Sequence, residues 1–492
     1  MKVLLINTGN DPGIGGNANE NAYPPLGVIS LATALVSEFK QDIDVEVIDC
    51  QVVTAASAVD VIIRKRPDLV GLSMYSTSIK NTIQMAQVAA SVGARVIVGN
   101  DHASMHASLL LSKVPSIEFI CTNDVGEETI LALVSHLRGE RSLEDVPLLA
   151  FRGANGEIHQ TKSSRYAPGS SLDDLPVPMR TLLGVEYWDE YARRFHLQER
   201  RYWDFEPETR VSTINRARGC AQMANPCRYC GIADLSIRYS TAPCFWADVR
   251  AARQDVGATV LYEAFDSASS APAVLRSWLK GRPDDLSDTA FKMYAQAFEC
   301  DSARVELFKR LNVFCLNMGL DSGDDHVLKL LKGDRHSLQG SKEACLRIAD
   351  AGIEVYTSFV LLGLGDADTT RRSLDKTVEF AEWLIDNSSV VSFDSALMYP
   401  DKAAPIGRLI WHPEEAASTA RDLGWDFLNL ERLKIVSDRW RSEVYLDPLE
   451  LCSDFASVCG VDGAMLMEYA AILEQMAKKA SLNFGRSQGG PQ

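Results

Sequence analysis

The chain has 492 residues, of which 46% are hydrophobic and 24% charged, a composition typical of a globular protein with two or three domains. Its formal net charge of −16 argues against a nucleic acid partner, because a polyanion needs a broad positive surface to neutralise its phosphates. No window is apolar for long enough to span a membrane, and residues 1–7 are too short for a signal sequence, so we expect a cytoplasmic protein.

Residues 1–140 alternate strand-like and helix-like patterns, which predicts a parallel sheet covered by helices on both faces. Such doubly wound, flavodoxin-like (Rossmann-type) domains bind ligands at the carboxyl ends of their strands. The segments expected there are polar or rich in glycine, as a ligand-binding rim requires: 7–24, 74–78, 99–106 and 122–127. The expected strands are 3–6, 45–48, 69–73, 96–98 and 117–120, and the expected helices are 27–39, 58–65, 79–92, 107–112 and 127–137.

Residues 141–210 have the pattern of a linker. A hairpin is expected around 154–156, and Pro176 and Pro178 predict an extended stretch because each proline restrains the residue before it. The segment from Tyr187 to Trp203 interleaves aromatic and basic residues. We expect it to shape a substrate pocket together with the carboxy-terminal helices.

Strand and helix patterns alternate again over residues 211–405, and six strand–helix units predict a partial (β/α)6 parallel barrel. Residues 406–492 are expected to form a helical carboxy-terminal region, with helices at 413–430, 433–444 and 464–480. The expected barrel strands are 211–215, 259–264, 291–295, 313–317, 354–361 and 390–397, separated by helices at 302–311, 324–331, 342–351 and 369–385.

Three of the eleven cysteines, Cys220, Cys227 and Cys230, share one loop directly after the first expected barrel strand. The other eight are scattered and fit ordinary core packing. Three thiolates this close can hold an iron–sulfur cluster in which one iron has no protein ligand. They can also hold zinc if a fourth ligand is near, and Cys244 is the natural candidate.

The cysteine loop resembles that of the radical S-adenosylmethionine (radical SAM) superfamily. Cys227-Arg-Tyr-Cys230 keeps the usual aromatic spacing, although six residues, 221–226, separate the first two cysteines where the family commonly has three. The resemblance implies that the three cysteines are catalytic and hold a 4Fe–4S cluster whose open iron binds S-adenosylmethionine (AdoMet). Asp321 replaces the glutamate of the family's Gly-x-Glu-Ser-Gly segment. The implied AdoMet contacts are Tyr229, Asp266, Ser267, Asp321, Ser322, Gly323 and Gly363.

The amino-terminal domain resembles the cobalamin-binding domain fused to one class of radical SAM enzymes. Segments 23–32, 67–73, 96–104 and 126–129 carry this resemblance. The motif that ligates cobalt through histidine is absent, so we expect His102 and His106 to be loop or pocket residues rather than cobalt ligands. The implied cobalamin contacts are Pro24, Leu26, Ser73, Gly99, His102, Ser104, Gly126 and Glu127.

The resemblance implies methylation of an unactivated carbon of a small metabolite. A 5′-deoxyadenosyl radical would abstract a substrate hydrogen, methylcobalamin would supply the methyl group, and an external donor of the flavodoxin or ferredoxin type would supply electrons. Two alternatives remain open. One is radical rearrangement, cyclisation or dehydration without methyl transfer, and the other is a non-catalytic, zinc-stabilised binding protein.

Overall fold

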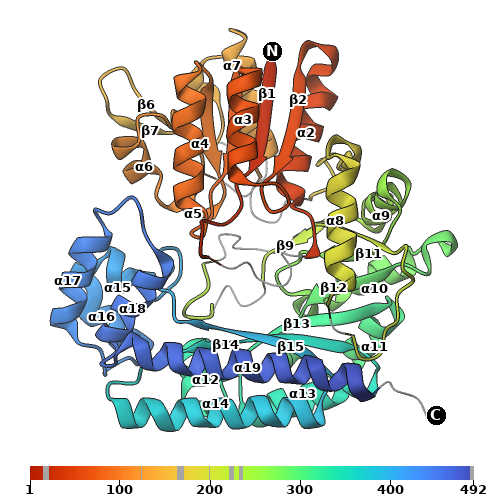
Figure 1. Ribbon diagram of the computed structural model, residues 1–492, viewed down its shortest axis with the longest axis vertical. Helices are drawn as coiled ribbons and strands as arrows, with labels where there is room; N and C mark the ends of the chain where they lie inside the picture. Colours follow the sequence, from red (N-terminus) through yellow and green to blue (C-terminus); the bar gives the residue numbers. More distant parts are fainter. Residues whose placement is uncertain are drawn as a thin grey trace.

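The computed structural model describes residues 1–14, 22–122, 125–162, 171–198, 200–220, 226–231 and 237–487, with side chains as far as residue 478. Two large sheets organise these residues, one of seven strands and one of six. In Figure 1 the amino-terminal sheet and its helices lie above the second sheet, and helix α8 (Val185–His196) runs along one side between the two.

The amino-terminal sheet has the strand order β2-β1-β3-β4-β5-β6-β7, and β1 to β5 are parallel. Its strands are β1 (Lys2–Asn7), β2 (Asp44–Asp49), β3 (Leu69–Ser73), β4 (Arg95–Gly99), β5 (Phe119–Cys121), β6 (Leu149–Arg152) and β7 (Ile158–Gln160). Its helices are α2 (Leu26–Phe39), α3 (Ala55–Lys65), α4 (Ile79–Ser91), α5 (Asp101–Met105), α6 (Ala107–Lys113) and α7 (Gly126–Leu137).

Both faces of this sheet are buried, and the alternating side chains of β1 show how. Val3 and Leu5 pack in the core that includes α2 and α7, whereas Leu4 and Ile6 pack in the core that includes α3 and α4. The predicted doubly wound domain is therefore confirmed.

The predicted hairpin is present, since β6 and β7 are antiparallel and Gly153 N–H donates to Glu157 O at 2.8 Å. The hairpin belongs to the amino-terminal sheet and is not only a connection between domains. Because β6 pairs antiparallel with β5, it extends the amino-terminal sheet as far as Gln160, within the segment that the sequence suggested as a linker.

The second sheet has the order β15-β14-β13-β12-β11-β8, and every neighbouring pair is parallel, as a partial barrel requires. The predicted (β/α)6 barrel is confirmed. Its strands are β8 (Arg210–Ile214), β11 (Ala258–Glu263), β12 (Ala290–Tyr294), β13 (Val313–Asp321), β14 (Glu354–Leu361) and β15 (Val390–Leu397). Its helices are α9 (Ala242–Val256), α10 (Pro272–Lys280), α11 (Ser302–Arg310), α12 (Asp325–Lys332), α13 (Leu338–Asp350) and α14 (Ala367–Asn387).

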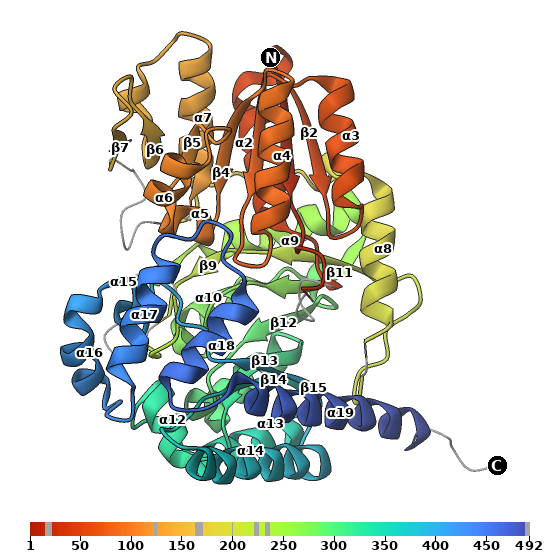
Figure 2. The ribbon, with the colours of Figure 1, turned by 60° about the vertical axis from the view of Figure 1, so that its left-hand side comes forward.

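The carboxy-terminal region is helical, as predicted, but the single helix expected over 413–430 is wrong. That stretch forms a 3-10 turn (Pro413–Glu415) and α16 (Ala416–Leu423), because Gly424 adopts φ +71° and caps the helix there. In Figure 2 the last helix runs along the edge strand β15. The other helices are α15 (Gly407–Trp411), α17 (Leu430–Trp440), α18 (Pro448–Val458) and α19 (Gly463–Ser487).

No single helix within the described ranges is long and apolar enough to cross a membrane. Helices α18 and α19 combine sufficient length and apolar composition only as a pair, which is bent by 118° at its junction.

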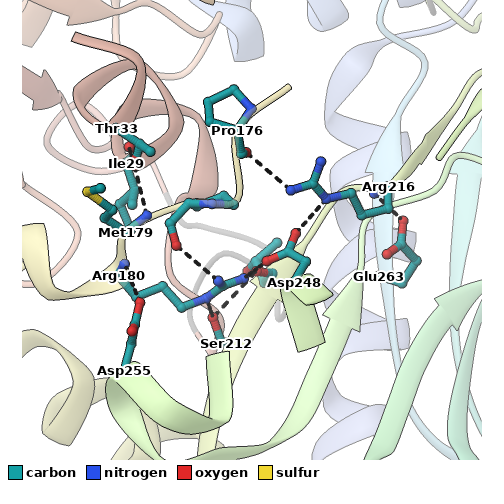
Figure 3. A network of polar contacts seen from close by, with 12 residues as sticks. Ile29, Thr33, Pro176, Met179, Arg180, Ser212, Arg216, Asp248, Asp255 and Glu263 are labelled. Carbon is teal, nitrogen blue, oxygen red and sulfur yellow. Dashed lines mark hydrogen bonds and ion pairs between the residues drawn. The ribbon is translucent and has the colours of Figure 1, made fainter. Parts of the chain in front are cut away.

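A buried ion-pair network ties the extended linker segment to the barrel (Figure 3). One oxygen of the Asp248 carboxylate lies 2.8 Å from Nη2 of Arg180, and the other lies 2.8 Å from Nε of Arg216. All three side chains are at most 3% exposed. Arg216 also donates to the carbonyls of Leu175 and Pro176, at 3.2 and 3.1 Å.

The same segment is tied to the amino-terminal domain. Met179 N–H donates to Oγ1 of Thr33 on α2 at 2.8 Å, and the next residue, Arg180, donates through Nε to Ser212 Oγ of β8 at 2.8 Å. Consecutive linker residues therefore hold α2 and β8 together, which fixes the two domains relative to each other.

Helix α8 contributes a second contact between the domains. Its Tyr191 hydroxyl donates to the Asp49 carboxylate at the end of β2, and its Phe195 ring lies 6.2 Å from the ring of Phe314 on β13 of the barrel. Tyr187, Trp188, Tyr191 and Phe195 are all buried. These aromatic side chains pack in the core, and none of them lines the cavity described next.

Candidate active site

A cavity of about 560 Å³ lies between the carboxyl ends of the amino-terminal strands and the barrel. The amino-terminal domain supplies most of its wall, including six of the residues predicted to contact cobalamin. The barrel closes it with residues that follow β8 and β11. The six predicted residues are Leu26, Ser73, Gly99, Ser104, Gly126 and Glu127, and the barrel residues are Asn215, Arg218, Ala264 and Asp266.

Small residues keep this cavity open. Its amino-terminal wall contains four glycines and three serines, and a Cβ added to Gly27 would meet no other atom within 4 Å. A wall of this kind leaves room for a broad, flat ligand, so the residues fit a corrin. The glycines are Gly27, Gly71, Gly99 and Gly126, and the serines are Ser30, Ser73 and Ser104.

Two of the predicted cobalamin contacts lie outside the cavity wall. His102 is buried, and its ring stacks on that of His106 at 4.5 Å. Burial lowers the pKa of His102 to about 4, so its imidazole is neutral at neutral pH. Pro24 accepts a hydrogen bond from Thr213 Oγ1 at 2.7 Å, and the next residue, Pro25, lines the cavity.

The cysteine loop begins at the barrel wall of the cavity. Strand β8 leads through β9 (Ala217–Arg218) to Gly219, whose φ of +90° favours glycine. Gly219 N–H donates to Oδ2 of Asp266 at 2.6 Å, and Asp266 also lines the cavity. The next residue, Cys220, is buried, and its Sγ accepts from Gln296 Nε2 at 3.2 Å.

The other two cysteines lie in a turn that is tied to the rest of the chain. Cys230 N–H donates to Cys227 O at 3.1 Å, Arg228 N–H donates to Leu331 O at 2.7 Å, and Ile406 N–H donates to Arg228 O at 2.9 Å. Residues 221–225, most of the enlarged loop, lie outside the described residues.

In the described part of the chain, no group of three His, Cys, Asp or Glu side chains is arranged to hold a metal ion. Cys244 interacts instead with Thr241 and Asp173. Three thiols from one loop are nevertheless the donor set that a cluster with an open iron needs, so the residue chemistry fits a 4Fe–4S cluster.

A buried lysine lies beside this turn. Lys332 Nζ is 2.8 Å from Asp321 Oδ2 and interacts with the thiols of Cys227 and Cys230. Burial raises the pKa of Cys227 to about 11, and the positive charge of Lys332 opposes that rise. Lys332 therefore favours the thiolate form that metal ligation requires.

Tyr229 and Asp321, both predicted AdoMet contacts, lie against each other. The Tyr229 hydroxyl donates to Asp321 Oδ2 at 2.9 Å. Asp321 is 1% exposed and adopts φ +58°, which is uncommon for a residue other than glycine. The carboxylate thus contacts both the cysteine turn and Lys332.

The remaining predicted AdoMet contacts are held by other parts of the barrel and the carboxy-terminal region. Ser322 Oγ and Gly323 N–H both contact Thr377 Oγ1 on α14, at 3.1 Å. A Cβ on Gly363 would lie 2.9 Å from Cys459 Cβ. Ser267 Oγ accepts from Ser270 Oγ at 2.9 Å. Their predicted contacts with AdoMet stay predictions.

Four residues of this region were not anticipated from the sequence: Asn215, Arg218, Gln296 and Lys332. Arg218 carried a signal, because it directly precedes Gly219-Cys220. Gln296 reaches the cysteine loop from the segment after β12, Lys332 reaches it from α12, and neither lies in a recognisable motif.

Comparisons with known proteins agree with this arrangement. Residues 16–134 match the model of the B12 binding domain. Over 190 residues the chain is 24% identical to an uncharacterized methyltransferase, PH0819, of Pyrococcus horikoshii, a match that covers 38% of this chain and 39% of that protein. The chain thus aligns with well under half of this curated relative.

Two solved structures share the fold over most of the chain. OxsB, a cobalamin-dependent S-adenosylmethionine radical enzyme with aqua-cobalamin and AdoMet bound, is 16% identical, with a TM-score of 0.61 over 98% of this chain and 72% of that one. TsrM from Kitasatospora setae, a radical SAM methyltransferase with cobalamin and a 4Fe–4S cluster bound, is 15% identical, with a TM-score of 0.61 over 84% and 75%. The chain therefore contains a B12 binding domain and has the fold of the cobalamin-dependent radical SAM enzymes.

Proposed function

We propose that the protein is a cobalamin-dependent radical SAM enzyme that methylates an unactivated carbon of a small molecule. The observation that carries this proposal is the position of Asp266. Its carboxylate lines the cavity beneath the B12 binding domain and also holds Gly219, the residue before the first loop cysteine. A corrin in the cavity and a cluster on the loop would therefore face one common space.

The chain's own residues would hold and orient the reacting groups. Cys220, Cys227 and Cys230 would ligate the cluster, and the glycine and serine wall would receive the corrin. When bound, the cluster supplies the electron that cleaves AdoMet, and cobalamin supplies the methyl group. The linker contacts of Met179 with Thr33 and of Arg180 with Ser212 hold the two domains together, and transfer between the two sites depends on the distance between them.

Partners and substrate follow from this chemistry. Reductive cleavage consumes electrons that the chain cannot generate, so we propose an external donor of the flavodoxin or ferredoxin class. A small-molecule substrate is supported by TsrM, which has been observed with tryptophan as its substrate.

Cofactor content is the first test. Protein purified without oxygen and reconstituted should contain about four irons per chain and no stoichiometric zinc. The Cys227→Ala variant should lose the iron, whereas Cys244→Ala should keep it. Zinc at one per chain that is lost in Cys244→Ala would overturn the proposal in favour of a structural zinc site.

Methyl transfer is the second test, and it can be run without a substrate. With cobalamin, a low-potential reductant and AdoMet carrying a deuterated methyl group, the loaded protein should release 5′-deoxyadenosine and pass the label to the cobalamin fraction. The Cys227→Ala variant should form no 5′-deoxyadenosine. If 5′-deoxyadenosine forms and the label never leaves AdoMet, methylation is wrong and a radical reaction without methyl transfer takes its place.

A further inference from the structure

The inner face of the barrel sheet carries polar side chains where core residues would be expected. Along β12, Phe291 and Met293 pack outward in the main core, so Lys292 between them points to the inner face. Along β13, Leu316 and Met318 pack outward, so Asn317 points inward as well. These two inward residues are almost fully buried, with exposures of 3% and 2%.

Lys292 is a buried lysine that forms no ion pair with a described residue, although the Cys315 thiol and the Glu354 and Asp394 carboxylates are near enough to act on its charge. Within the described ranges no carboxylate forms an ion pair with it, and its Nζ lies 5.0 Å from the ring centre of Tyr356 and 5.8 Å from that of Tyr23. The carboxylates of Asp394 and Glu354 lie nearby but contact other groups, and Oε2 of Glu354 has no hydrogen-bond partner among the described residues. The Asp394 carboxylate accepts from the Tyr356 hydroxyl at 2.9 Å, and the Glu354 carboxylate accepts from the N–H groups of Arg201 and Tyr202, at 2.5 and 3.0 Å.

The side chain of Asn317 also lacks partners, because neither its Nδ2 nor its Oδ1 atom forms a hydrogen bond within the described part of the chain. The hydroxyl of Tyr23, a residue 3% exposed, has none either. Each buried polar atom left in this state costs about 1–3 kcal/mol, so such atoms are rare in folded proteins. With Glu354 Oε2, which lies on the same face, four such atoms are found here, and they indicate that something else supplies their partners.

These groups lie close enough to contact one ligand. Lys292 pairs with Cys315 across β12 and β13, and the next inward pair toward the carboxyl end is Tyr294 with Asn317. Two residues along a strand span about 6.6 Å, a distance that a lysine side chain can reach across. Asn317 pairs on its other side with Tyr356, whose ring already contacts Lys292.

The group also adjoins the cavity. Tyr23 reaches the inner face of the barrel, where its ring lies 5.3 Å from that of Tyr262, and Pro25, two residues later, lines the cavity. A ligand on the inner face would therefore lie next to the proposed corrin site, which is where a methyl acceptor belongs.

We propose that Lys292 and Asn317 bind the carboxylate of the substrate inside the barrel. This inference rests on the proposed function. One carboxylate oxygen would accept a hydrogen bond from the ammonium group of Lys292, and the other would accept one from the side-chain amide of Asn317. The rings of Tyr23, Tyr262 and Tyr356 form apolar surroundings for the body of the molecule, so the substrate class is a small aromatic or apolar carboxylic acid.

The test compares carboxylic acids with their primary amides, which keep the shape and lose the charge. The probes are benzoate, indole-3-acetate and 4-hydroxyphenylacetate with their amides, added to protein loaded with cluster, cobalamin and AdoMet, and binding is measured by saturation-transfer NMR. At least one acid should bind roughly tenfold or more tightly than its amide. Equal binding of acids and amides, or no binding of any acid, would overturn the proposal.

Two variants locate the site. Lys292→Met should weaken binding of the acid roughly ten- to hundredfold and leave its amide unchanged. The exposed Lys309→Met, on α11, is the matched control and should change neither. Asn317→Leu should also weaken binding of the acid. If acid preference survives in Lys292→Met, the carboxylate binds elsewhere and the proposal is wrong.

Melting temperatures show whether Lys292 and Asn317 bind a ligand or hold the barrel together. Because Lys292 forms no ion pair and the Asn317 side chain makes no hydrogen bond in the described part of the free protein, Lys292→Met and Asn317→Leu should melt no lower than the wild type without ligand. A fall in melting temperature for both variants would show that they hold the barrel together, and it would overturn the proposal.

AdoMet also carries a carboxylate, and its binding is measured separately by equilibrium dialysis. Lys292→Met should leave AdoMet affinity unchanged. A parallel loss of AdoMet and acid binding would assign the site to the AdoMet carboxylate and overturn the substrate assignment. Failure of the proposed function would give a different result, since the loaded protein would then release no 5′-deoxyadenosine while acid binding at Lys292 persisted.

Discussion

The hydroxyl of Tyr229 donates to the carboxylate of Asp321 at 2.9 Å, so the residue next to the last loop cysteine is fixed by the end of β13. The same carboxylate oxygen lies 2.8 Å from the ammonium of Lys332. Side chains from a loop, a strand and a helix therefore share one buried charge. Two of the three cysteines lie beside it.

Asp321→Asn should destabilise the barrel and the cysteine turn together. The substitution leaves Lys332 buried without a counter-charge, and breaking a buried pair in this way costs about 3–5 kcal/mol. We expect a lower melting temperature and a lower iron content after reconstitution. The matched control is Asp334→Asn, which removes the exposed ion pair with Lys329 and should change stability by less than about 1 kcal/mol. Equal effects of the two substitutions would contradict this interpretation.

Asp248→Asn should loosen the linker from the barrel. It leaves the guanidinium groups of Arg180 and Arg216 buried without their shared carboxylate, with an expected loss of about 3–5 kcal/mol. Limited proteolysis should then cut the segment around 172–180 faster than in the wild type. Asp285→Asn, which removes an exposed partner of Arg250, is the control and should leave the cleavage rate unchanged.

Glu263 should make the protein less stable as pH rises. Burial raises the pKa of Glu263 to about 8, from an ordinary value of 4.5, although N–H groups of Arg216 and Ala217 donate to its carboxylate. Between these two values the folded state holds a proton that the unfolded state releases. Stability due to this group is therefore complete below the lower value and falls with rising pH, by at most about 1.4 kcal/mol per pH unit.

The Glu263→Gln variant removes that proton exchange. Its melting temperature, measured from about pH 5 to about pH 8, should fall less with pH than that of the wild type. The exposed Glu306→Gln, on α11, serves as the control and should follow the wild type. A wild-type slope in Glu263→Gln would show that another group is responsible.

Gly27→Phe should block the cavity without unfolding the protein. Gly27 lines the cavity at the start of α2, and a Cβ there has free space around it. We expect a melting temperature near that of the wild type and cobalamin uptake reduced at least about tenfold, measured by absorbance after reconstitution and gel filtration. Ala56→Phe, on the exposed face of α3, should bind cobalamin normally. Normal uptake by Gly27→Phe would place the corrin elsewhere.

Much of the fold was readable because its strands are short runs rich in apolar and β-branched residues between clear helix signals. The runs at 69–73, 354–361 and 390–397 match β3, β14 and β15 residue for residue. Strand β3 is apolar up to its last residue, as parallel strands covered on both faces are, whereas β14 and β15 alternate more buried and less buried residues. The helical region was less readable, because a change from one helix to the next depends on a single residue, such as Gly424 after α16.

The candidate site was partly readable. The three cysteines and six cavity residues could be named because they follow strands in local motifs. Lys332, Gln296 and the interior pair Lys292 and Asn317 could not, because their importance depends on contacts between elements far apart in the sequence. The replacement of the family's glutamate by Asp321 was visible in the sequence, but the contact of Asp321 with Tyr229 required the three-dimensional structure.

The linker contacts have a consequence for how the protein acquires its largest ligand. Thr33 lies on α2, whose first turn forms part of the cavity wall, and Ser212 lies on β8, which leads to the cysteine loop. Consecutive linker residues contact both, so α2 and β8 cannot move apart unless the hydrogen bond of Met179 to Thr33 or that of Arg180 to Ser212 breaks. A corrin that enters the folded protein therefore meets a cavity whose two walls are already held together.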